Sequence, residues 1–122
     1  MDVALAQAAL ALPDDVPVGA AVTDASGRVI ALRAAAAAHG AWNLEGCTLV
    51  VTLEPCAMCA GALLQARVSR LVFGAWDEKA GAAGSVYDLV RDRRLPVRAE
   101  VVGGVREAEA SRLLRAFFDA RR

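Results

Sequence analysis

The sequence contains few of the residues from which metal and catalytic sites are usually built, with one histidine, His39, and three cysteines. An odd number of cysteines argues against a disulfide framework and agrees with a reducing compartment. No apolar run reaches the roughly 18 residues of a membrane-spanning helix, and the start, Met1 and Asp2, lacks the basic residues of a signal peptide. We therefore expect a soluble, cytoplasmic protein with no membrane partner.

Aromatic residues and early basic residues are also scarce. Aromatics make up 5% of the chain, and alanine supplies much of the 57% that is hydrophobic. Only Arg28 and Arg33 among the 14 basic residues precede residue 67, so residues 1–66 carry a net charge of −4 and residues 67–122 one of +4. A basic second half can meet phosphates, although solvated helix faces explain the same charges. The length of 122 residues predicts a single domain, residues 1–122, with one core.

Hydrophobic patterns and turn residues predict a three-layer α/β domain whose mixed sheet of about five strands is flanked by helices. Two buried strands, at residues 47–52 and 68–74, are joined by a helix at residues 56–65 and so predict a right-handed parallel βαβ unit. The last helix carries an apolar stripe of Leu113, Leu114, Phe117 and Phe118. The other predicted strands are residues 16–23, 28–30 and 97–102, and the predicted helices are residues 2–12, 31–38, 107–121 and a short one, residues 85–90, capped by Ser85.

The most informative stretch is Thr-Leu-Glu-Pro-Cys-Ala-Met-Cys, residues 52–59, which leads a strand into a helix. Pro55 ends the strand and presets the first helical turn, and the i,i+3 spacing places the sulfurs of Cys56 and Cys59 on one helix face. The helix N-terminus favours thiolate, the form of cysteine that binds metal. The pair therefore predicts half of a four-ligand zinc site. A catalytic zinc takes three ligands from the protein and keeps the fourth position for water, so one further protein ligand is needed. A thioredoxin-like redox pair is the alternative interpretation of the same spacing.

With its proline before the first cysteine, this stretch resembles the P-C-x-x-C half of the zinc nucleoside and nucleobase deaminases. The resemblance covers nearly the whole chain, because five further strings are similar in order and spacing to the bacterial tRNA adenosine deaminases. It implies a cytidine-deaminase-like fold, a homodimer, and zinc-dependent hydrolytic deamination of the wobble adenosine in a tRNA anticodon stem-loop to inosine, with the base flipped out. The five strings are residues 16–20, 46–49, 77–85, 101–105 and 113–118.

The same resemblance implies roles for six residues. Cys56 and Cys59 map onto the two cysteine ligands of the zinc ion. Glu54 maps onto a residue that supports the cysteine loop rather than one that moves the proton. Ordinary structural roles are the alternative for Glu54 and for the substrate-side residues. Those substrate-side residues are Val18, a pocket wall, and Asp77 and Lys79, next to the RNA.

The sequence departs from the family in one place, because it has no His-Ala-Glu string, which supplies the third ligand and the proton-carrying glutamate. In relatives this string opens the helix predicted here at residues 31–38. The predicted strand runs into that helix without turn residues, so we place a gap of about twenty residues near residues 28–31. Val29 and Ile30 can belong to either side of the gap.

No other residue is expected to fill the vacancy, so no catalytic residue is assigned. In relatives the histidine ligand opens this helix about a dozen residues before the position of His39, which is roughly 18 Å of helix, whereas a zinc–nitrogen bond is about 2 Å. Glu45 lies in a surface turn, and Glu54 precedes the cysteine loop. Three hypotheses follow: a normal enzyme with a segment missing from this sequence, a genuinely short and inactive deaminase fold that serves as a dimer partner or RNA-binding remnant, or a deaminase of free guanine or cytosine.

Overall fold

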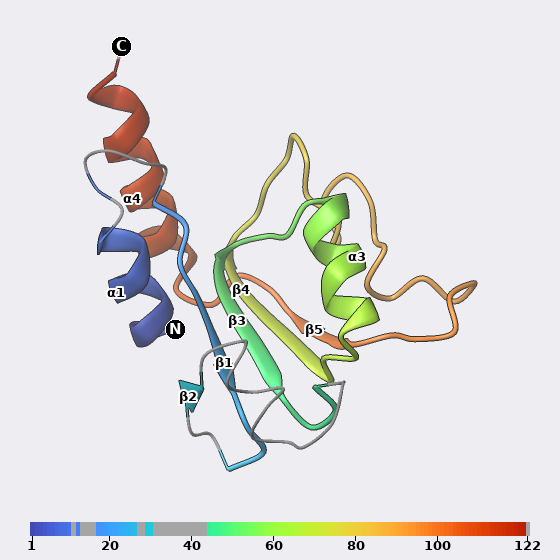
Figure 1. The fold of residues 1–122 in the computed structure, drawn as a ribbon. Helices are drawn as coiled ribbons and strands as arrows, with labels where there is room; N and C mark the ends of the chain where they lie inside the picture. The colour runs from blue at the N-terminus through green and yellow to red at the C-terminus, as the bar shows by residue number, and fades with distance from the viewer. Residues whose placement is uncertain (11, 13–16, 27–28, 31–43, 122) are drawn as a thin grey trace.

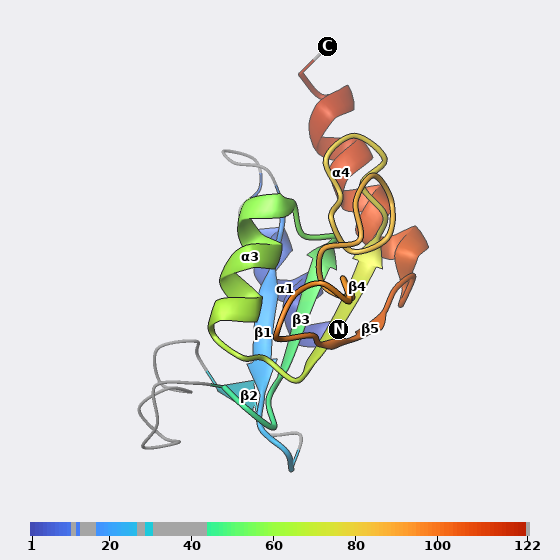
Figure 2. The ribbon, with the colours of Figure 1, turned by 90° about the vertical axis from the view of Figure 1, so that its right-hand side faces the viewer.

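The computed structural model describes residues 1–10, 12, 17–26, 29–30 and 44–121. These residues form three layers, with a central sheet, helix α3 on one face, and helices α1 and α4 on the other (Figure 1 and Figure 2). This confirms the predicted three-layer α/β class. The elements are α1 (Asp2–Leu10), β1 (Ala20–Thr23), β2 (Val29–Ile30), β3 (Thr48–Leu53), α3 (Ala57–Gln65), β4 (Arg70–Ala75), β5 (Glu100–Val102) and α4 (Glu107–Asp119).

The sheet is mixed, as the sequence predicts. Within the described residues it has five strands in the order β2-β1-β3-β4-β5. Strand β1 is antiparallel to both neighbours, so that Val22 lies opposite Ile30 of β2 and Leu49 of β3. Strands β3, β4 and β5 are parallel, with Leu49 opposite Leu71 and Leu71 opposite Val101. Because β3, α3 and β4 follow one another in the chain, they form the predicted βαβ unit.

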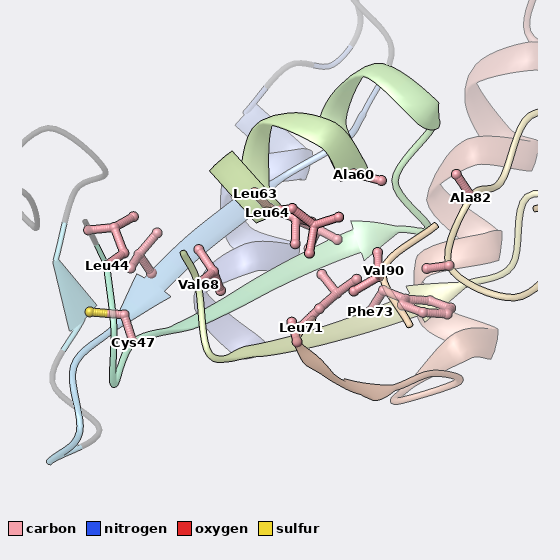
Figure 3. Packing of buried hydrophobic residues seen from close by; sticks show 14 residues of the cluster. Leu44, Cys47, Ala60, Leu63, Leu64, Val68, Leu71, Phe73, Ala82 and Val90 are labelled. Atoms are coloured by element: carbon pink, nitrogen blue, oxygen red, sulfur yellow. The ribbon is translucent and has the colours of Figure 1, made fainter. Parts of the chain in front are cut away.

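The main core lies between the sheet and α3. Strand β4 directs alternate side chains to its two faces, and Leu71 and Phe73 on the α3 side are fully buried. They pack in one cluster with Leu63 and Leu64 of α3 (Figure 3). The ring of Phe73 also meets Trp76 edge to face, with the ring centroids 4.8 Å apart. Burial of these large side chains fixes α3, and therefore the cysteines at its N-terminus, against the sheet.

Helices α1 and α4 cover the opposite face of the sheet and pack very closely against it. A Cβ atom at Gly74 in β4 would lie 2.9 Å from the Cβ of Ala110 in α4 and 2.8 Å from the carbonyl oxygen of Thr52. A Cβ at Gly19, just before β1, would lie 1.9 Å from the carbonyl oxygen of Ala4 in α1. Only glycine fits such approaches, so the two positions set how closely these helices pack.

The sequence prediction was wrong for residues 85–90, which form turns rather than a short helix. Ser85 caps no helix, because its hydroxyl and its backbone N–H both donate to the carboxylate of Glu54. The backbone N–H of Gly84 donates to the carbonyl oxygen of Tyr87 (2.9 Å), and Ala83 pairs with Asp88 in an isolated bridge. Distant hydrogen bonds therefore override the local capping signal.

Other boundaries differ by a few residues. Strand β1 begins at Ala20 rather than near residue 16, and β5 begins at Glu100 rather than at residue 97. The predicted helix at residues 31–38 and His39 lie outside the described residues, as do residues 28 and 31 of the junction near residues 28–31. Val29 and Ile30 are described, and they form β2 by pairing with Thr23 and Val22. No helix in the part of the chain that the structure describes is long and apolar enough to cross a membrane.

Candidate metal centre

The cysteine pair lies where β3 turns into α3. The backbone N–H of Glu54 still donates to the carbonyl oxygen of Ala75 (2.9 Å), so pairing with β4 extends to the end of β3. Pro55 then breaks the ladder, since it has no N–H to donate. Cys56 is the N-cap residue of α3, with extended backbone angles (φ −73°, ψ 176°), and its carbonyl oxygen accepts the first helical hydrogen bond, from Ala60. The predicted order of strand, proline and helix is thus confirmed, but the helix begins at Ala57 rather than at residue 56, and Pro55 precedes the N-cap instead of presetting the first helical turn.

The two cysteines differ in environment. The Cys56 sulfur forms no cap hydrogen bond, but the nearby backbone N–H groups of Cys59 and Met58 favour its thiolate and lower its pKa. Cys59 is exposed overall, yet partial desolvation of its sulfur and the adjacent Cys56 sulfur raise its pKa. The helix N-terminus was expected to lower the pKa of both cysteines, but only the pKa of Cys56 is lowered. The third cysteine, Cys47, is buried, and this burial raises the pKa of its thiol.

A cavity of about 520 Å³ opens beside the cysteine pair. Side chains of β1, β3 and α3 form its wall, which is mainly apolar. The ionisable residues in this wall are Glu54, Cys56, Cys59 and Asp77. Cavities of this size and composition are typical of small-molecule sites with a few convergent polar groups. The other lining residues are Val18, Ala20, Ala21, Val22, Leu49, Val51, Leu53, Pro55, Ala62, Leu63, Ala66 and Val68.

Glu54 is a buried carboxylate, 2% exposed. All hydrogen bonds that the structure records for it come from loop 77–85. Its Oε1 accepts the N–H of Asp77 (3.0 Å) and the hydroxyl of Ser85, and its Oε2 accepts the N–H groups of Ala83 (2.9 Å) and Ser85 (3.1 Å). Burial alone raises the pKa of Glu54, but these hydrogen bonds favour the charged form, and the net pKa lies below its usual range. Glu54 is therefore an acceptor that organises a loop, and not a free acid or base.

Loop 77–85 is also attached directly to the cysteine turn. The backbone N–H of Ala82 donates to the carbonyl oxygen of Pro55 (2.8 Å), and Cys56 pairs with Gly81 in an antiparallel bridge. Gly81 lies so close to Glu54 that a Cβ there would come within 2.4 Å of the carboxyl carbon. The loop and the cysteine turn therefore form one packed unit.

A second cavity, of about 870 Å³, lies between the end of β4 and helix α4. Leu53 and Asp77 line both cavities, so the two adjoin. The second wall is richer in polar and aromatic groups than the first. Its other lining residues are Ala75, Trp76, Glu78, Lys79, Glu107, Ala108, Ser111, Leu114, Arg115 and Phe118.

The structure brings together five of the six residues singled out in the sequence, since all but Lys79 line the first cavity. Val18 is 44% exposed, so it is a rim residue and not a core valine. Lys79 lies in the second cavity, and Asp77 accepts its backbone N–H at Oδ1 (3.0 Å). Sequence reasoning missed Ser85, whose hydroxyl binds Glu54 across 31 positions, because nothing local signals that contact. It also missed Trp76 and Phe118 as site residues. Both are exposed aromatic residues in the wall of the second cavity, which only the folded structure shows.

The donor set fits a zinc ion in part. Thiolates are good zinc ligands, but a catalytic zinc takes three protein ligands. Among the described residues, no group of three or more histidine, cysteine, aspartate and glutamate side chains is arranged to hold a metal ion. Among the described residues the cysteine pair offers two thiolate groups, which by themselves are too few for a catalytic zinc site.

Several known proteins are similar to this chain in sequence and in fold. Over 94 residues the chain is 48% identical to the tRNA-specific adenosine deaminase of Bacillus subtilis, an alignment that spans 77% of this chain and 58% of that protein. It is 48% identical to the tRNA(Ile)-lysidine synthase of Deinococcus deserti over 128 positions, which span 88% of this chain and 24% of that protein. Because 88% of 122 residues is about 107, about twenty positions of the Deinococcus protein face a gap in this chain. The chain thus spans less than two thirds of either relative.

A solved structure agrees over a longer stretch. It comes from biochemical and structural studies of A-to-I editing by tRNA:A34 deaminases at the wobble position of transfer RNA. The two structures superpose with a TM-score of 0.85 at 36% identity, over 93% of this chain and 97% of that one. The resemblance to tRNA adenosine deaminases inferred from the sequence is thereby confirmed, and the fold is of the cytidine-deaminase type. The model of the MafB19-like deaminase family matches residues 5–122, and the chain belongs to that family.

Proposed function

We propose that this domain belongs to a zinc-dependent tRNA adenosine deaminase, which hydrolyses the wobble adenosine of an anticodon stem-loop to inosine. The observation that carries the proposal is the cysteine pair in the wall of an apolar cavity of about 520 Å³. An apolar pocket beside a metal-binding pair suits a flipped-out base, which is stacked between apolar side chains while its edge is read by a few polar groups. By the same proposal the protein acts in the cytoplasm.

Cys56 and Cys59 are the zinc ligands of this proposal. The lowered pKa of Cys56 supports its role, because the thiolate is the form that binds metal. Zinc, when bound, supplies Lewis acidity that brings the pKa of a water molecule toward neutrality. The protein residues of the cavity exclude bulk water from the base and orient it.

The domain needs a segment that its sequence lacks. About twenty positions of the Deinococcus deserti relative face a gap in this chain, which is the length of the segment expected to be missing. Strand β2 ends at Ile30, so we place the insertion point between Ile30 and Ala31. By family resemblance this segment carries the His-Ala-Glu string, which provides the third ligand and the glutamate that moves the proton.

The second cavity suits the RNA side of the site. Trp76 and Phe118 are 41% and 49% exposed in its wall, and aromatic rings are the usual platforms on which unstacked bases lie. Lys79 and Arg115 in the same wall can meet the phosphate backbone. Asp77 lines both cavities. It therefore lies between the pocket proposed for the flipped-out base and the surface proposed for the RNA backbone.

A homodimer is also part of the proposal. Met58 on α3 is 79% exposed, and Val86 and Tyr87 on the neighbouring loop are 46% and 62% exposed. Tyr87 lies beside Ala57 at the start of α3, and large apolar side chains that are exposed in this way suit an interface that another subunit covers.

The proposal is tested with a completed chain, defined as this sequence with a relative's His-Ala-Glu segment inserted between Ile30 and Ala31. Loaded with zinc, it is expected to convert an adenosine-containing anticodon stem-loop to the inosine form and to leave free guanine and free cytosine unchanged. Product formation is followed by mass spectrometry of digested RNA and of the free bases. The matched control is a stem-loop with guanosine at the wobble position.

Two outcomes would replace the proposal. Turnover of a free base in preference to the stem-loop would make this a nucleobase deaminase. Correct folding and full zinc occupancy without turnover of any of the three substrates would favour an inactive deaminase fold.

A further inference from the structure

The buried carboxylate of Glu54 is more costly than folding alone requires. Burying a charge is an expensive way to gain stability, and a well-packed apolar residue of similar volume is often as good or better. Here the charge is compensated by four hydrogen bonds, all from a loop 23 to 31 positions further along the chain. What the carboxylate gains over an apolar residue is geometric, because four directed donors fix where the loop lies.

The donors come from both ends of loop 77–85. The N–H of Asp77 binds at the start of the loop, and the N–H groups of Ala83 and Ser85 bind near its end. Between these points Asp77 Oδ1 accepts the N–H groups of Lys79 (3.0 Å) and Ala80 (3.2 Å), which closes a tight turn. Glu54 therefore holds a preformed turn at its base, with Asp77 at the boundary of the two cavities.

We propose that Glu54 is a positioning residue that sets the substrate-facing loop 77–85 against the cysteine turn, so that RNA binding depends on its carboxylate. The inference rests on the proposed tRNA substrate. It differs from the expected support of the cysteine loop, because every hydrogen bond recorded for this carboxylate leads to loop 77–85. The residues it positions are Asp77 and Lys79, which line the cavities on either side of the loop.

Glutamine at position 54 isolates this role, because it keeps the shape of the side chain. A carboxylate has about four acceptor sites on two oxygens, whereas an amide has one oxygen and an NH₂ group that can only donate. In Glu54→Gln an NH₂ group takes the place of one carboxylate oxygen. It cannot accept the backbone N–H donors that this oxygen binds in the native chain, so their hydrogen bonds are lost. The variant should fold while releasing one end of the loop.

The test measures two quantities on the 122-residue chain. Hydrogen exchange is expected to speed up at least about tenfold in Glu54→Gln, relative to amides of β3 and β4, either at the amide of Asp77 or at the amides of Ala83 and Ser85, depending on which oxygen the NH₂ group replaces. The Kd for a fluorescein-labelled, adenosine-containing anticodon stem-loop, measured at fixed salt, is expected to rise about fivefold. Ser85→Ala, which removes only the hydroxyl donor, is expected to change both quantities in the same direction by a smaller factor, and it serves if Glu54→Gln does not fold.

Thr52→Val is the control for a merely structural effect. The hydroxyl oxygen of Thr52 is buried and accepts the N–H of Gly19 (3.0 Å), away from the loop. The variant is expected to lower stability while leaving loop exchange and RNA affinity unchanged. Unchanged loop exchange in Glu54→Gln, or an RNA affinity that falls only as much as in Thr52→Val, would overturn the inference. Failure of both the native chain and the completed chain to bind any stem-loop would instead refute the tRNA substrate, whatever the exchange result.

Discussion

The chain of 122 residues is expected to form no inosine in an adenosine-containing stem-loop, whereas the completed chain forms it readily. The physical reason is that the described residues provide two thiolates and no arrangement of three metal ligands. By family resemblance the missing His-Ala-Glu segment also carries the glutamate that moves the proton, so we expect the 122-residue chain to lack this group as well. General acid–base catalysis alone contributes about 10²-fold to 10⁴-fold, so the difference in rate should be at least about 100-fold.

This comparison is measured by inosine content after single-turnover incubation with excess protein and added zinc. The control is the completed chain with glutamine in place of the inserted glutamate, which should fold and bind zinc but lose the activity. Inosine formed by the 122-residue chain at a rate close to that of the completed chain would contradict the account, because it would require a proton carrier and a ligand from within the present sequence.

Removal of either cysteine of the pair is expected to empty the zinc site of the completed chain. Residues that only orient a ligand already change metal affinity by 10-fold to 100-fold, so Cys56→Ala and Cys59→Ala should each lower zinc affinity by at least about 100-fold. Zinc per protein is measured by atomic emission after dialysis against a moderate chelator. The expected value is near one in the completed chain and near zero in both variants.

Cys47→Ala provides the matched control for this experiment. Cys47 is buried in the main core, at the end of the sheet where β3 begins (Figure 3), and it does not line the cavity. The variant should therefore keep its zinc and lose only a little stability. Equal zinc loss in all three variants would mean that the metal responds to general unfolding and that the pair is not its specific ligand set.

The parts of the site that the sequence could predict are local. Pro55, Cys56 and Cys59 lie within five positions, and their geometry follows from the end of a strand and the first turn of a helix. The strands and the parallel βαβ unit were equally accessible, because hydrophobic runs and turn residues mark them directly.

The parts that the sequence could not predict depend on contacts between distant positions. Ser85 has the local appearance of a helix cap, yet Glu54, 31 positions earlier, takes its hydroxyl and its N–H. Phe118 belongs to a predicted apolar stripe, but in the structure Phe117 is buried while Phe118 stays 49% exposed beside the second cavity. In both cases the side chain's role depends on which element lies opposite, and no local pattern carries that information.

The central claim, that this chain carries two of the three ligands of a zinc site, is tested most directly by titrating zinc into the 122-residue chain in competition with a chromophoric chelator. We expect weak binding that the chelator reverses, at least about 100-fold weaker than in the completed chain. One equivalent of zinc per chain, held against the chelator as tightly as in the completed chain, would contradict it and would show that the present sequence already contains the third ligand.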